Sequence, residues 1–176
     1  MAYISLPTLD QMEPAVREQL EGARAKTGDP GEIAYLVAIR PDIFNMTMVM
    51  VRTLLLNQTQ LPYRIKETIA LMVSAQNRCD MCVGEHVRIA KLLGMTEAQV
   101  EAALAGLDAM DLPDNERTLM AFCLKASGKE SYRVGPSDIT AVKAAGYSDA
   151  QILEAVAVVG YFNYINTISN ALGAGK

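Results

Sequence analysis

Apolar side chains recur along the chain at intervals of three and four residues, the spacing that places them on one face of an α-helix. Between residues 61 and 76, for example, Ile65, Ile69, Met72 and Val73 form one such stripe. No segment shows the strict alternation of apolar and polar residues that is typical of a half-buried β-strand. The pattern therefore predicts an all-α fold. The expected helices cover residues 9–26, 32–39, 42–57, 61–76 and 79–93.

Capping and breaking residues mark the expected helix ends. Pro62 suits the first turn of a helix, whereas Gly28 and Gly94 suit the position that follows a last turn. Asn77 is a candidate N-cap for the helix that comes next, because its short polar side chain can accept a hydrogen bond from a free backbone N–H. The sequence Asp-Pro-Gly at residues 29–31 predicts a turn between two helices.

A short sequence occurs twice in similar form. KLLGMTEAQ at residues 91–99 aligns with KAAGYSDAQ at residues 143–151, 52 positions later. In each copy a helix ends at Gly, and the next begins with Thr or Ser followed three residues later by Gln, which is a capping box. Leu-Pro at 61–62 likewise recurs at 112–113. Capping boxes are common enough for this to arise by chance, but we interpret the pattern as a duplicated helical unit.

The chain is expected to form one all-helical domain over residues 1–176. Within it we distinguish N-terminal helices at about 9–57, a core segment at about 61–110 and the second copy of the repeat at about 112–173. A length of 176 residues is compatible with a single domain of this kind.

The composition excludes several functional classes. Hydrophobic residues make up 51% of the chain, which argues against intrinsic disorder. The net charge of −4 argues against nucleic-acid binding, which usually requires a basic surface. Three cysteines are too few for a disulfide scaffold at this length, and one histidine cannot build a His-rich metal site.

Membrane and export signals are not expected. The first residues carry no basic segment and no apolar core, so they do not resemble a secretory signal. The longest apolar runs, Phe44–Val51 and Ile69–Val73, are much shorter than the roughly 20 residues of a spanning helix. We therefore expect a soluble protein of the reducing cytoplasm, where closely spaced cysteines are more often catalytic or metal-binding than structural.

The strongest chemical signal is the sequence C-D-M-C-V-G-E-H at residues 79–86. It contains two of the three cysteines as a C-x-x-C motif, together with the only histidine. Residues four positions apart share one face of a helix, so the His86 imidazole can hydrogen-bond the Cys82 thiol and take its proton. Cys79 lies one turn earlier, at the expected helix start, within disulfide reach of Cys82.

This arrangement suits peroxide chemistry. The N-terminus of a helix favours negative charge and therefore the thiolate. A thiolate attacks a peroxide, becomes a sulfenic acid and then condenses with a neighbouring thiol. Glu67, beside the apolar stripe of the preceding helix, is the candidate carboxylate that orients His86 and stabilises its charge. A solvated surface carboxylate is the simpler role for Glu67, and Glu85, the neighbour of His86, points elsewhere on the helix.

Three other interpretations remain open. Cys79, Cys82, His86 and Glu67 could bind zinc, although structural zinc sites usually draw their ligand pairs from separate turns. The two cysteines could instead be small core residues, or the protein could be a non-enzymatic helical interaction module or redox sensor. Cys123 lies on an apolar helix face and is expected to be a core residue.

The segment from Glu67 to His86 resembles the core of the alkylhydroperoxidase D-like, or carboxymuconolactone decarboxylase-like, superfamily, and it is similar to the peroxidase-related branch. The spacing E-x11-C-x2-C-x3-H is met at all four positions, including Cys79 and Cys82. The resemblance extends less tightly over residues 40–94 and again over residues 162–173.

The resemblance implies an all-helical fold with a duplicated unit, assembled as a trimer or hexamer. It also implies peroxidase and disulfide-reductase chemistry on a small-molecule hydroperoxide. In this chemistry Cys82 is the peroxidatic thiol, Cys79 resolves it, and His86 and Glu67 relay the proton. The implied reductant is a lipoyl- or thioredoxin-like dithiol, and no cofactor is implied. Since the decarboxylase branch generally lacks the cysteine pair, lactone decarboxylation is not expected.

Two positions depart from the family pattern. Met81 stands where some members carry a second histidine or an aromatic residue, which predicts slower turnover or a different substrate. Thr167 follows Asn166 where an arginine often follows.

The 51% hydrophobic content also exceeds what a helical monomer of this size needs, which favours apolar surface buried between subunits.

Overall fold

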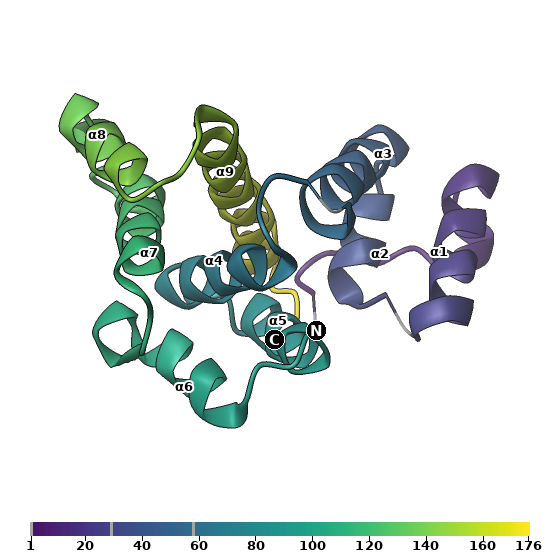
Figure 1. Cartoon of the computed structure of the whole chain (residues 1–176). Helices are drawn as coiled ribbons and strands as arrows, with labels where there is room; N and C mark the ends of the chain where they lie inside the picture. Colours follow the sequence, from purple (N-terminus) through teal and green to yellow (C-terminus); the bar gives the residue numbers. More distant parts are fainter. Residues whose placement is uncertain (1, 29, 58) are drawn as a thin grey trace.

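The computed structural model describes residues 2–28, 30–57 and 59–176. Helices α4 and α9 cross at the centre of the fold, with α1 to α3 on one side and α6 to α8 on the other (Figure 1). Both ends of the chain lie next to α5. The α-helices are α1 (Pro14–Thr27), α2 (Glu32–Ala38), α3 (Pro41–Met50), α4 (Tyr63–Gln76), α5 (Asp80–Leu92), α6 (Glu97–Ala105), α7 (Asp114–Ser127), α8 (Pro136–Ala144) and α9 (Asp149–Leu172).

The all-α prediction is confirmed over the described residues, which contain helices and no strand. No helix among these residues is both long and apolar enough to cross a membrane. Both predicted capping boxes form, at Thr96–Gln99 and Ser148–Gln151. The duplication that they suggest stays a prediction. Asp29, in the predicted turn at 29–31, lies outside the described residues.

Two predicted helices are interrupted. The helix expected over residues 9–26 begins later than predicted: Leu9–Gln11 forms a separate short 3₁₀ turn, and α1 runs from Pro14 to Thr27. Proline disfavours helical conformation in the residue before it, and Glu13 accordingly has φ −56° and ψ 137°. The helix expected over residues 42–57 changes type, because Val51–Leu56 forms a π-helix in which Asn57 N–H donates to the carbonyl of Arg52 at 3.0 Å.

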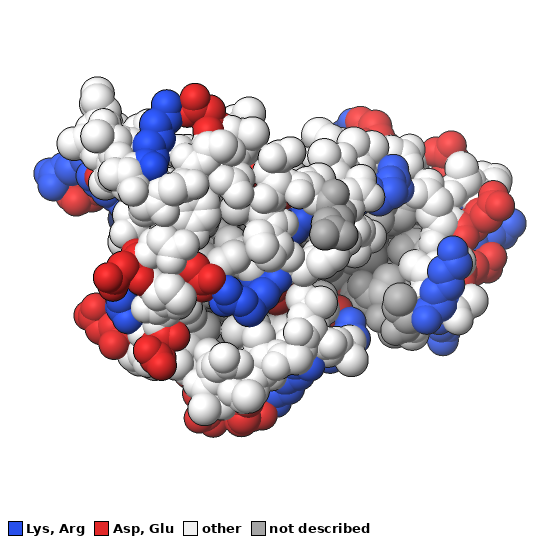
Figure 2. All heavy atoms as spheres, in the orientation of Figure 1, with Lys and Arg blue, Asp and Glu red and all other residues white. Residues whose placement is uncertain are grey.

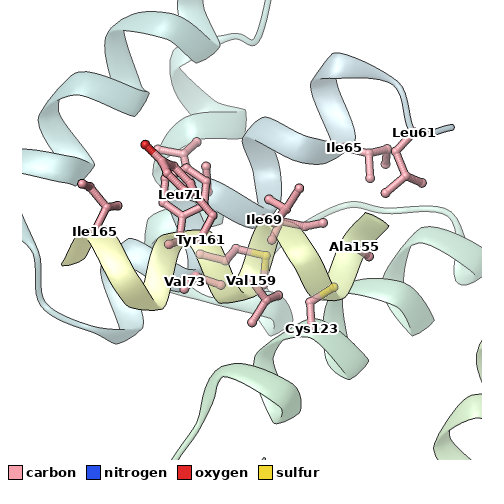
Figure 3. Packing of buried hydrophobic residues seen from close by; sticks show 14 of the residues in the cluster. Leu61, Ile65, Ile69, Leu71, Val73, Cys123, Ala155, Val159, Tyr161 and Ile165 are labelled. Carbon is pink, nitrogen blue, oxygen red and sulfur yellow. The ribbon is translucent and has the colours of Figure 1, made fainter. Parts of the chain in front are cut away.

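The core lies where α4, α7 and α9 meet. Ile69 of α4, Val159 of α9 and Cys123 of α7 come together in this region (Figure 3). Cys123 is 2% exposed, as the sequence predicts for a core residue. Burial raises the pKa of the Cys123 thiol to about 12, so this cysteine stays protonated and unreactive at neutral pH.

An ion pair between α4 and α9 is buried in this core. Lys66 is 2% exposed and its Nζ lies 3.6 Å from a carboxylate oxygen of Glu154, which is 9% exposed. Glu154 also accepts hydrogen bonds from the Thr59 hydroxyl and from the backbone N–H groups of Gln60 at 2.8 Å and Leu61 at 3.1 Å. The pair therefore fixes the loop that leads into α4 against the first turns of α9.

Replacing Lys66 by methionine tests this role. The substitution leaves the Glu154 carboxylate buried without its cation, and we expect the free energy of unfolding to fall by about 3–5 kcal/mol. Urea unfolding followed by circular dichroism at pH 7 measures the loss. The double variant Lys66→Met/Glu154→Gln removes both charges and should recover part of it. An exposed ion pair contributes at most about 1 kcal/mol to stability. A smaller loss than this in the single variant would therefore contradict a structural role for the Lys66–Glu154 pair.

Candidate active site

The turn between α4 and α5 places the C-x-x-C motif. The sequence predicts Asn77 as the N-cap of α5, and this is wrong: Asn77 closes α4, with its backbone N–H donating to Val73 O at 2.9 Å. Arg78 follows in the left-handed region, with φ +53°. Cys79 is then the N-cap residue of α5, and its carbonyl accepts the first helical hydrogen bond from Val83 N–H at 2.8 Å. The motif therefore lies at the positive end of a helix dipole.

Cys79 and Cys82 are joined by a disulfide. Their Cα atoms are 5.3 Å apart, which lies within the usual range for such a bond. Cys79 is 0% and Cys82 5% exposed, so the oxidised pair is enclosed by protein.

His86 lies one helical turn after Cys82, and its ring contacts Glu67 of α4. The distance from His86 Nδ1 to Glu67 Oε1 is 2.6 Å, and the two side chains are only 12% and 7% exposed. Glu67 is therefore not a solvated surface carboxylate. An ionised carboxylate only accepts hydrogen bonds, so an ionised Glu67 pairs with the Nδ1–H tautomer of a neutral imidazole, in which Nε2 can accept a proton. The structure thus joins the four predicted site residues as two pairs, a disulfide at the start of α5 and a hydrogen bond between α5 and α4.

Phe162 of α9 packs against the imidazole ring of His86. Its ring meets the His86 ring edge to face, with the centroids 4.7 Å apart and the planes at 81°. Phe162 is 0% exposed, so the contact restricts how His86 can turn. The sequence does not predict this contact, because Phe162 stands with Tyr161 and Tyr164 in an apolar helix, a pattern that indicates only a core or subunit-interface role.

Asparagines of α9 hold the turn from which Cys79 emerges. Asn77 Nδ2 donates to Asn163 at 2.8 Å and to Asn166 at 3.0 Å, and Asn170 Nδ2 donates to the Asn77 carbonyl at 2.9 Å. Asn166, 1% exposed, also donates to Ser74 at 3.2 Å. The cluster is not predicted from the sequence. Its signal is the spacing of the three α9 asparagines, which places them on one helix face.

Other candidates lie apart from this site. Glu85 is exposed and pairs with Arg88. No cluster of three or more His, Cys, Asp or Glu in the described parts of the chain is arranged to hold a metal ion. Two grooves, of about 260 Å³ beside Pro41 and about 510 Å³ beside Arg64, are lined by none of the four site residues.

Comparison with known proteins supports the resemblance drawn from the motif. Residues 41–125 match the carboxymuconolactone decarboxylase family. The fold matches the alkylhydroperoxidase AhpD core of an uncharacterised peroxidase-related protein from Ralstonia eutropha JMP134, with a TM-score of 0.91 and 24% identity over 98% of this chain and 90% of that one. The family match and the shared fold both agree with the resemblance to the alkylhydroperoxidase D-like, or carboxymuconolactone decarboxylase-like, superfamily.

Two further structures share the fold. An uncharacterised peroxidase-related protein from Silicibacter sp. TM1040 has a TM-score of 0.91 and 22% identity over 98% of this chain and 90% of that one. The debrominase Bmp8, in complex with 2,3,4-tribromopyrrole, has a TM-score of 0.80 and 17% identity over 99% of this chain and 92% of that one. Comparison with curated proteins gives no match. The solved structures that share this fold thus include a debrominase as well as uncharacterised peroxidase-related proteins.

Replacing Glu67 by glutamine tests its link to His86. Glutamine keeps an oxygen that can accept the Nδ1 hydrogen bond, but it loses the charge that stabilises an imidazolium. In a reduced Cys79→Ser background, we expect iodoacetamide to alkylate Cys82 about tenfold more slowly at pH 7. Intact-mass spectrometry over a range of pH follows the reaction. Glu85→Gln, on the exposed face of α5, is the matched control, and equal rates in the two variants would rule out the proton relay.

Proposed function

We propose that this protein is a thiol-dependent peroxidase that reduces hydroperoxides through the Cys79–Cys82 pair. The observation that carries the proposal is the enclosed disulfide at the start of α5, one helical turn from the only histidine, which is itself hydrogen-bonded to a buried carboxylate. A nucleophile, a base and a group that orients the base are the parts that covalent catalysis requires.

The proposed reaction starts from the reduced pair. The Cys82 thiolate, favoured by the N-terminus of α5 and by proton transfer to His86, attacks one oxygen of the hydroperoxide. The O–O bond breaks, the leaving alkoxide takes a proton from His86 to become an alcohol, and Cys82 becomes a sulfenic acid. The Cys79 thiol then attacks the Cys82 sulfur, water leaves, and the disulfide forms. Glu67 stabilises the imidazolium while His86 holds the proton.

The enzyme returns to its reduced state by disulfide exchange. A lipoyl- or thioredoxin-like dithiol donates two electrons and two protons, becomes a disulfide itself and leaves Cys79 and Cys82 as thiols. We assign the peroxidatic role to Cys82 because it shares a helix face with His86, whereas Cys79 is the N-cap residue one turn earlier.

Peroxide consumption by single-cysteine variants tests the proposal. With dithiothreitol as reductant and cumene hydroperoxide as substrate, we expect Cys82→Ser to lose peroxidase activity. After prereduction and removal of dithiothreitol, one equivalent of the hydroperoxide should convert Cys79→Ser to a sulfenic acid that dimedone traps on Cys82. Dimedone trapped instead on Cys79 of the Cys82→Ser variant would reverse the assigned roles. A wild-type protein that forms the disulfide but completes only one turnover would support the redox-sensor alternative over an enzyme.

We further propose that the protein forms homo-oligomers through an apolar patch on α9, the first residue of α4 and the segment before α4. The patch comprises Leu56, Tyr63, Leu153 and Val156, with Leu153 70% and Leu56 62% exposed. These elements are adjacent, since Gln151 of α9 donates to the carbonyl of Gln60 at 3.2 Å. Figure 2 shows a mostly uncharged surface between α9 and the segment that leads into α4. A cluster of large exposed apolar side chains is typical of a subunit interface.

Light scattering coupled to size-exclusion chromatography tests the oligomer. We expect the wild-type protein to elute as a trimer or hexamer and Leu153→Asp to elute as a smaller species, because a charge at the patch opposes its burial. Leu92→Asp is the matched control, since Leu92 is 74% exposed on α5, outside the patch. A monomeric wild-type protein would show that the prediction of an oligomer is wrong.

A further inference from the structure

The disulfide is enclosed, yet every step proposed for it requires contact with a sulfur atom. Thiol–disulfide exchange needs an incoming thiolate to reach the sulfur that it attacks. Cys79 is 0% and Cys82 5% exposed, and neither groove described above is lined by these residues. Some part of the protein that covers the motif must therefore move before a reductant can react.

The residues that follow α9 lie directly on the motif. Met81, between the two cysteines, is in contact with Gly175, because a Cβ atom at Gly175 would lie only 2.9 Å from Met81 Cβ. Gly175 has φ +77°, a backbone conformation that side chains rarely adopt. On its other side, the Met81 sulfur lies 3.8 Å from the Ser169 hydroxyl of α9. We call residues 173–176 the tail segment.

The carboxylate of Glu32 holds the outer half of the tail segment in place. Glu32 of α2 accepts hydrogen bonds from Gly175 N–H at 2.6 Å and from Ala2 N–H at 2.8 Å. These two bonds hold the pKa of the Glu32 carboxyl below its usual value, the bond from Gly175 contributing most. Tyr3 N–H also donates to the Leu172 carbonyl at 2.7 Å. Both ends of the described chain thus converge beside α5 (Figure 1).

The outer half of the tail segment, Gly175 and Lys176, is exposed and can move without disturbing the core. Its contact with Glu32 lies at the surface, and the bond from Gly175 to Glu32 is solvent-exposed. Gly173 and Ala174 are buried and stay attached to α9, because Ala174 N–H donates to the Ser169 carbonyl at 3.0 Å. A segment held by a few exposed hydrogen bonds opens at a much lower free energy than the helices around it.

We propose that the tail segment and Met81 form a removable cover over the Cys79–Cys82 disulfide, and that Glu32 is the latch that keeps it closed. The inference rests on the proposed function, because it assigns the control of access to the same site. When the cover opens, a small dithiol reaches a sulfur, is oxidised to its own disulfide and leaves two thiols. When the cover is closed, the oxidised pair is protected from reduction.

The rate of disulfide reduction tests the cover without any peroxide. The oxidised protein is incubated with dithiothreitol, quenched with acid and labelled with N-ethylmaleimide in denaturant. Intact mass then shows one label on Cys123 before reduction and three labels after it. We expect Glu32→Gln to be reduced about fivefold faster than wild type, because the latch loses its charge-assisted hydrogen bonds.

Two further variants separate the latch from a general effect on the fold. Gly175→Ala displaces the tail segment from Met81 by steric clash and should accelerate reduction to a similar extent. Glu18→Gln, an exposed acid on α1, is the matched control and should react at the wild-type rate. Thermal unfolding of all variants, followed by circular dichroism, should give midpoints close to wild type.

The outcomes for the cover and for the peroxidase are distinct. If the double variant Glu32→Gln/Gly175→Ala is reduced no faster than wild type, the cover is overturned, whatever the peroxidase assay shows. If the latch variants are reduced faster while no peroxide is consumed, the cover stands and the proposed peroxidase function fails.

Discussion

Helix α4 is enclosed by protein over ten successive residues, Ile65 to Ser74, and two of these residues carry charge. Lys66 and Glu67 are adjacent in the chain, so their side chains leave the helix in different directions. A buried charge is tolerated only when it is paired. α9 provides the carboxylate of Glu154 for Lys66, and α5 provides the imidazole of His86 for Glu67. The pairing of these two charges therefore fixes how both neighbouring helices lie against α4.

α9 supports the candidate site along its whole length. Near its start, Glu154 fixes the loop before α4, and in its middle Phe162 contacts His86. Its asparagines then hold the turn before Cys79, and its last turn lies beside Met81. These contacts follow one another along the sequence because α9 is one long helix that packs across the site. The chemistry proposed for α5 thus depends on a helix that contributes no reacting group.

Much of the site could be predicted because its signal is local. The helical period and the spacing of Cys79, Cys82 and His86 lie within two turns of one helix, and their geometry is fixed by the helix itself. The interruption of the predicted helix before Pro14 is also a local effect. It is not predicted because the apolar spacing continues across it. The contacts of the tail segment are different in kind, since Glu32 and Gly175 are 143 residues apart. No periodicity relates such residues, and only the folded chain brings them together.

The single histidine has a consequence for observing the molecule. His86 is the only imidazole among 176 residues, and it lies between a buried carboxylate and the edge of a buried phenyl ring. Its carbon-bound ring protons should therefore give one isolated pair of resonances in a proton spectrum. The ring current of Phe162 and the oxidation state of Cys82, one helical turn away, both affect the chemical shifts of these two protons. The protein thus carries its own spectroscopic reporter of the redox site, with no label to be introduced.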